Sequence, residues 1–229
     1  MEHVLFTDLT ANRLRARVNQ APVAYLPLGA LKSQQDHLPL GFAGILSQGL
    51  FSALAREVGG VVLPVVYFSP ELPQSLCMIS PECSICRVSL TAFANLVECL
   101  IHEVADYGFR IVVAHGYDPS IEALEVHRLA WEQKYGLRIL LFSRILPQDM
   151  TLTDQPPAAG MEACLMRALC PELVDLAHDP LDGDASSLRR LPGDPLEAAY
   201  AEQGERALDL QVGAMASILQ KALQELVDR

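Results

Sequence analysis

The chain has 229 residues, of which 51% are hydrophobic and 20% charged, and its formal net charge is -11 at pH 7. This length suits one large α/β domain, and the apolar content excludes a mostly disordered chain because burying that surface offsets the entropy of ordering the backbone. The acidic balance disfavours nucleic acid as a partner, since phosphate backbones attract basic surfaces. Only six histidines are present, which leaves little material for a His-rich metal site.

Short apolar runs alternate with amphipathic stretches of helical period along the chain. They predict strands over 22–28, 61–68, 109–115 and 137–145, and helices over 43–58, 91–107, 120–135, 158–169 and 205–227. This alternation predicts an α/β fold, with a single three-layer α/β/α domain over residues 1–229 and a mostly parallel sheet covered by helices on both faces. An irregular insertion rich in proline and serine is expected at about 69–87.

Targeting and membrane signals are absent from the sequence. The first residues contain no apolar run long enough for a signal peptide, and no stretch reaches eighteen consecutive apolar residues. We therefore expect a cytoplasmic protein with no membrane partner.

Three of the six cysteines, Cys77, Cys83 and Cys86, form a C-x5-C-x2-C pattern inside the expected insertion. A C-x2-C pair can present two thiolates to one ion, so a metal or redox site is one interpretation. The other is a set of buried or free thiols, because no second C-x2-C or H-x3-H pair supplies the remaining ligands. The sequence leaves both interpretations open.

Ligands of open α/β sheets bind at the carboxyl ends of the strands, where neighbouring loops converge. Three loops follow strong strand candidates here, at residues 29–43, 115–120 and 144–158. Candidate functional residues are therefore sought in these loops. No P-loop, G-x-G-x-x-G or G-x-S-x-G motif accompanies them.

Four segments in and around these loops carry recognisable motifs. Residues 26–41 read LPLGALKSQQDHLPLG, residues 108–116 read GFRIVVAHG, residues 170–175 read CPELVD, and the GDP at 193–195 is followed by EQG at 202–204. Taken together, they resemble the creatininase (creatinine amidohydrolase) family, whose motifs read LPVGSxEQHGPHLPLGTD, GFRRIVIVNGHGGN, HAGExETSLMLxLxPELVD and GDPxxATxExG. The matches keep their order from residue 22 to about 228, and the resemblance implies a creatininase-like fold.

The resemblance also implies a hydrolase with two divalent metal ions, held by Glu, His and Asp in the first loop and by His and Glu in the second. An ungapped match places these five positions at Lys32, Gln34, Ala43, Gly116 and Asp118. A one-residue shift in the second loop would instead place His115 at the ligand histidine. The family's later His falls at Pro157, while the Glu of its ETS motif falls at Glu162.

This residue set is poorly suited to two metal ions. Closely spaced divalent cations need several anionic oxygens to offset their mutual repulsion, and Ala43 has none where the resemblance places the bridging carboxylate. The ammonium of Lys32 adds positive charge where the resemblance places a metal ion. Repulsion between two such charges a few Å apart costs about 4 kcal/mol in a medium with a dielectric constant of 20. We therefore expect neither a metal ion nor another cofactor.

The remaining polar residues define a tentative pocket. Lys32 could replace the missing cations by pairing with Asp118 or Glu162, could stabilise charge or act as a base in a metal-free reaction, or could be a solvated loop lysine. His115 ends a strand and is either a hydrogen-bonded structural group or a pocket residue. We take Lys32, His115, Asp118 and Glu162 as candidate catalytic residues, and Gln34 and His37 as candidate ligand-binding residues.

These residues favour a creatininase-like protein that has lost the dinuclear metal site and acts as a non-catalytic or repurposed subunit that binds a small polar ligand. The alternative is a hydrolase with a rebuilt, metal-independent site that cleaves a C–N bond or opens a ring. The resemblance implies a homo-oligomer, commonly a hexamer, or a hetero-oligomer with a metal-competent paralogue.

Overall fold

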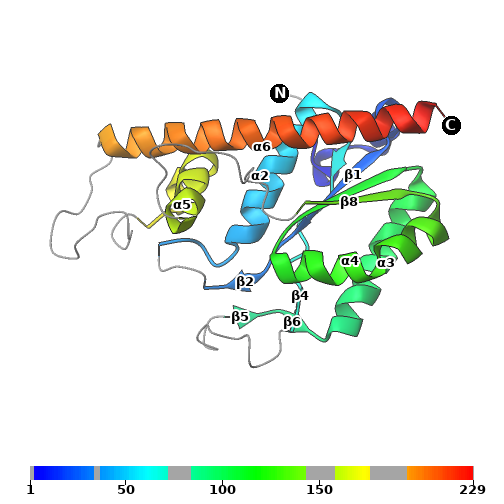
Figure 1. Ribbon diagram of the computed structural model, residues 1–229, viewed down its shortest axis with the longest axis horizontal. Helices are drawn as coiled ribbons and strands as arrows, with labels where there is room; N and C mark the ends of the chain where they lie inside the picture. The colour runs from blue at the N-terminus through cyan, green and yellow to red at the C-terminus, as the bar shows by residue number, and fades with distance from the viewer. Residues whose placement is uncertain (1–2, 34–36, 72–83, 143–157, 176–194, 229) are drawn as a thin grey trace.

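The computed structural model describes residues 3–33, 37–71, 84–142, 158–175 and 195–228 (Figure 1). The helices in this part of the chain are α1 (Ala11–Gln20), α2 (Phe42–Glu57), α3 (Leu90–Tyr107), α4 (Asp118–Tyr135), α5 (Ala158–Leu169) and α6 (Pro195–Val227). Two 3-10 turns accompany them, η1 (Phe6–Asp8) and η4 (Pro171–Leu173). The strands are β1 (Val23–Leu28), β2 (Leu31–Lys32), β3 (Val61–Val62), β4 (Ser69–Pro70), β5 (Ser84–Ile85), β6 (Arg87–Val88), β7 (Ile111–Gly116) and β8 (Arg138–Phe142).

A parallel sheet with the strand order β3-β1-β7-β8 forms the centre of the fold. β1 and β7 pair along their whole length, from Val23 opposite Ile111 to Leu28 opposite Gly116. Every residue of β1 is buried, which is typical of a parallel strand covered on both faces. The carboxyl ends of β1 and β7 therefore open at the same edge of the sheet.

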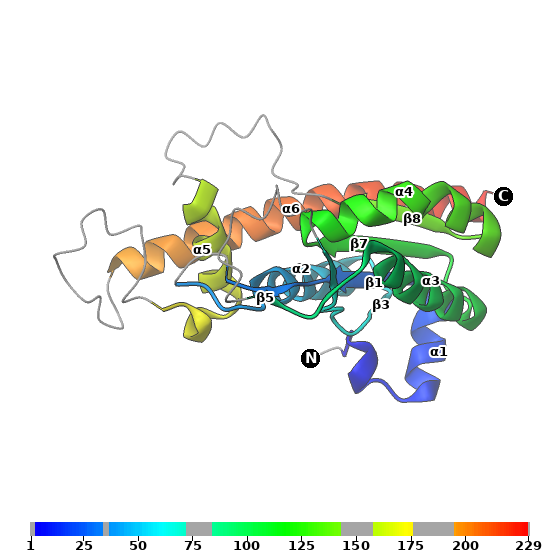
Figure 2. The same cartoon turned by 90° about the horizontal axis from the view of Figure 1, so that it is seen from below.

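Alternate residues of β1 pack against different helical layers, because successive side chains of a strand point to opposite faces. Val23 and Tyr25 pack with α2 and α6, whereas Ala24, Leu26 and Leu28 pack with α1, α3 and α4. Figure 1 shows α2 and α6 on one side of the sheet and α3 and α4 on the other, and Figure 2 shows α1 near the end of the sheet that carries β3. The predicted three-layer α/β/α architecture with a mostly parallel sheet is confirmed.

The predicted elements differ from the structure in three places. The strand expected over 61–68 is reduced to β3, because the chain passes Pro64 and rejoins β1 only through a single bridge between Val66 and Leu28. The last helix begins at Pro195, ten residues before the expected position 205. The first helix, α1, was not expected from the sequence, although Thr10 caps it by accepting a hydrogen bond from the Arg13 amide.

The insertion expected at 69–87 carries short strands in its described parts. β4 pairs in parallel with β6, and β5 pairs antiparallel with β2, where Lys32 lies opposite Ser84. The β2–β5 pairing attaches the end of the insertion to the loop that follows β1. Cys77 and Cys83 lie outside the described residues, while Cys86 is a half-buried free thiol with a positive φ of 61°.

Ser89 caps the first turn of α3 by accepting a hydrogen bond from the Ala92 amide. Cys99, in the same helix, is an exposed free thiol. Across the described ranges, no helix combines the length and apolar character needed to cross a membrane.

Candidate functional site

The candidate site lies where β1 and β7 end side by side. Gly116 closes β7 opposite Leu28, and the amide of Tyr117 donates a 2.8 Å hydrogen bond to the Leu28 carbonyl. The chain then enters α4 at Asp118. This geometry places the start of α4 next to the loop that follows β1, as the parallel topology predicts.

Lys32 reaches this point from the β2–β5 ribbon. Its amide donates a 3.0 Å hydrogen bond to the Leu40 carbonyl, which closes the loop after β1. Its ammonium lies 4.6 Å from the ring centroid of Tyr117, within the range of a cation–π interaction. Tyr117 is also the residue that precedes α4 at its N-terminus, so an ammonium and the positive end of a helix dipole meet here.

A second tyrosine, Tyr67, packs against the same loop. Its ring is packed on Gly29, Gly41 and Gly44, where an added Cβ would lie 2.7, 3.3 and 2.6 Å from ring atoms. Burial raises the pKa of the Tyr67 phenol, which therefore keeps its proton at neutral pH. Ala43 stands between two of these glycines, so the Tyr67 ring lies beside the turn that carries it.

Neither tyrosine was identified from the sequence. Tyr117 directly follows the predicted strand, and its position at a strand end was the signal that could have drawn attention to it. Tyr67 gave no such signal, because its contact with the loop depends on how the chain returns to β1 after β3. The strands β2 and β5, which hold Lys32, could not be predicted from periodicity either, because each has only two residues.

His37 lies under the loop and is 1% exposed. Its carbonyl accepts a 2.9 Å hydrogen bond from the Asp175 amide, just after η4. The neighbouring residues Leu38 and Phe42 pack with Met166 of α5 in a small apolar cluster. His37 thus joins the loop to the α5 segment, and its role in ligand binding stays a prediction.

His115 faces the α2 layer. Its ring is 9% exposed and lies edge-on to Phe51, with 6.0 Å between ring centroids, while its carbonyl accepts a 2.7 Å hydrogen bond from the Ser47 hydroxyl. Within the described part of the chain, its Nδ1 atom has no hydrogen-bond partner. Burial lowers the pKa of His115 to about 4, so the ring is neutral at physiological pH.

The buried ring of His115 predicts a specific pH dependence of stability. The unfolded chain binds a proton at His115 near pH 6.5, but the folded chain binds it only near pH 4. The stability that the neutral His115 ring gives the folded state is therefore complete above pH 6.5 and is lost as the pH falls. Between pH 7.5 and 5 we expect the folded state to lose about 2 kcal/mol through this group. Urea unfolding of the wild type and of His115→Leu at both pH values measures how much the free energy of unfolding falls in each protein. An equal fall in the two proteins would contradict the assignment of this loss to His115.

The other predicted residues are distributed around this centre. Asp118 is the first residue of α4, and Glu162 is half-buried on α5, while Gln34 lies outside the described residues. The structure therefore brings Lys32 and Asp118 to neighbouring segments and turns His115 toward another layer. In the described ranges, no three His, Cys, Asp or Glu side chains are grouped closely enough to hold a metal ion.

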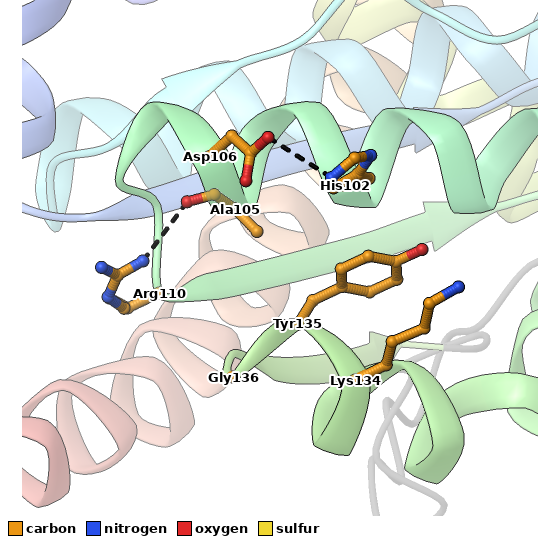
Figure 3. A pocket seen from close by; sticks show the side chains of 7 residues that line it. All are labelled: His102, Ala105, Asp106, Arg110, Lys134, Tyr135 and Gly136. Carbon is orange, nitrogen blue, oxygen red and sulfur yellow. Dashed lines mark hydrogen bonds and ion pairs between the residues drawn. The ribbon is translucent and has the colours of Figure 1, made fainter.

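A separate hollow of about 570 Å³ lies at the opposite edge of the sheet (Figure 3). It is bounded by the C-terminal ends of α3 and α4, and its lining residues are His102, Ala105, Asp106, Arg110, Lys134, Tyr135 and Gly136. The polar groups there already have partners: His102 lies 3.3 Å from Asp106, and Arg110 donates to the carbonyl of Ala105. Lys134 reaches Glu98 at 2.8 Å. This hollow is lined by polar residues at two helix ends and is distinct from the strand-end site.

Comparison with known proteins identifies relatives over nearly the whole chain. The family model Creatininase, described as creatinine amidohydrolase, matches residues 7–219. No curated protein matches the chain significantly.

Solved structures with the same fold are also found. A crystal structure of creatinine amidohydrolase (creatininase) has a TM-score of 0.70 and 23% identity, covering 97% of this chain and 99% of that one. A putative creatinine amidohydrolase from Bacteroides fragilis NCTC 9343 has a TM-score of 0.71 and 20% identity, covering 98% of each chain. A structure named Creatininase Mn has a TM-score of 0.69 and 20% identity, covering 97% of this chain and 99% of that one.

Proposed function

The chain belongs to the creatininase family, and we propose that it has lost the family's dinuclear metal site and acts as a non-catalytic subunit that binds a small polar ligand. The observation that carries this proposal is Lys32, which the motif match places at the first metal-binding position. Its ammonium lies against the Tyr117 ring at the end of the strands, which is where ligands bind in open α/β sheets.

The side chains present do not fit a pair of divalent cations. Ala43 offers no oxygen at the position of the bridging carboxylate, and Gly116 offers no imidazole. The Tyr67 ring packs on the glycines on either side of Ala43, so the side chain beside this turn is an aromatic ring and not a carboxylate. Of the five matched positions only Asp118 keeps a carboxylate, and one carboxylate cannot offset the repulsion of two ions.

The same groups are suited to an anionic or strongly polar small molecule. An ammonium provides a fixed positive charge with three donors, and the N-terminus of α4 adds the positive end of a helix dipole. The protonated phenol of Tyr67, in contact with the same loop, supplies an aromatic surface and one hydroxyl. In this proposal the protein is cytoplasmic and works within a homo-oligomer or beside a metal-competent paralogue.

Metal analysis tests the loss of the site directly. We expect protein purified without added ions to contain well under one equivalent of Mn or Zn, and calorimetric titration with either ion to show no stoichiometric binding. The matched control is the double variant Lys32→Glu with Ala43→Asp, which restores two carboxylates and should bind divalent ions measurably.

Stoichiometric metal in the wild type, together with creatinine hydrolysis that a chelator abolishes, would overturn the proposal. Creatinine hydrolysis without metal would instead favour the rebuilt site. In that case Lys32→Met should abolish turnover while the circular dichroism spectrum stays unchanged.

A further inference from the structure

We draw no further inference here: the strongest candidate, the polar hollow between the C-terminal ends of α3 and α4 (Figure 3), is lined by side chains already bonded within the protein, Lys134 to Glu98, His102 to Asp106 and Arg110 to main-chain carbonyls, and nothing in the described residues shows which ligand it would take.

Discussion

Replacing Gly116 with alanine is expected to lower the free energy of unfolding by about 4 kcal/mol or to prevent folding. A Cβ at this position would lie 1.8 Å from the carbonyl oxygen of Leu28 and 2.7 Å from its carbonyl carbon. Both atoms belong to the neighbouring strand and cannot rotate away. Gly116 also has a φ of +142°, a conformation that side-chain-bearing residues rarely adopt.

Gly136→Ala separates the steric part of this effect from the conformational part. Gly136 has a φ of +64° and no atom within 4 Å of an added Cβ, so its substitution should cost only about 1 kcal/mol. Urea unfolding followed by circular dichroism measures both variants. Equal losses in the two would show that backbone conformation alone, and not the contact with Leu28, makes Gly116 necessary.

Gly116 also has a structural role that bears on the candidate site. The family pattern places a metal-binding histidine at position 116, yet here the residue serves the close approach of β7 to β1. Tyr117 follows it directly and accepts the Lys32 ammonium on its ring. A larger residue at 116 would therefore displace the group that positions Lys32, as well as strain the sheet.

The sequence could predict the layered fold because burial imposes a period on each long element. Strand β1 is buried throughout, and α3 keeps Phe93, Val97 and Ile101 on one buried face, so both patterns are visible without a structure. The site was harder to predict, since its geometry depends on short pairings between distant segments. Lys32 is held by two residues of the insertion, and Tyr67 by three glycines that are not adjacent to it in sequence.

The start of α6 could not be predicted from the sequence either. The apolar stripe predicted a helix only from 205, because residues 200–204 contact α5 instead of the sheet, through an aromatic ring, a polar side chain and a glycine. Arg167 of α5 lies 5.3 Å from the Tyr200 ring, and the Cys164 thiol lies 3.6 Å from the Gln203 side-chain oxygen. A helix that packs through such contacts lacks the apolar period on which the prediction relied.

Replacing Gly204 with alanine should separate these two helices. A Cβ at Gly204 would lie 1.9 Å from the Cys164 carbonyl oxygen and 3.1 Å from the Ala168 side chain. Alanine is favoured over glycine inside a helix by about 1 kcal/mol, but contact with a backbone oxygen at this distance forces the helices apart. We expect a net loss of about 3 kcal/mol or more in the free energy of unfolding.

Gly213→Ala is the matched control for this prediction, because Gly213 lies in the same helix and has no atom within 4 Å of an added Cβ. That variant should gain up to about 1 kcal/mol from helix propensity alone, so the two substitutions should shift the urea midpoint in opposite directions. Hydrogen exchange adds a local measurement: in Gly204→Ala, amides of α5 should exchange faster than those of β7. Since α5 carries Glu162 and packs against the loop of His37, its displacement would reach the candidate site, whereas unchanged exchange in α5 would show that the close helix contact is dispensable.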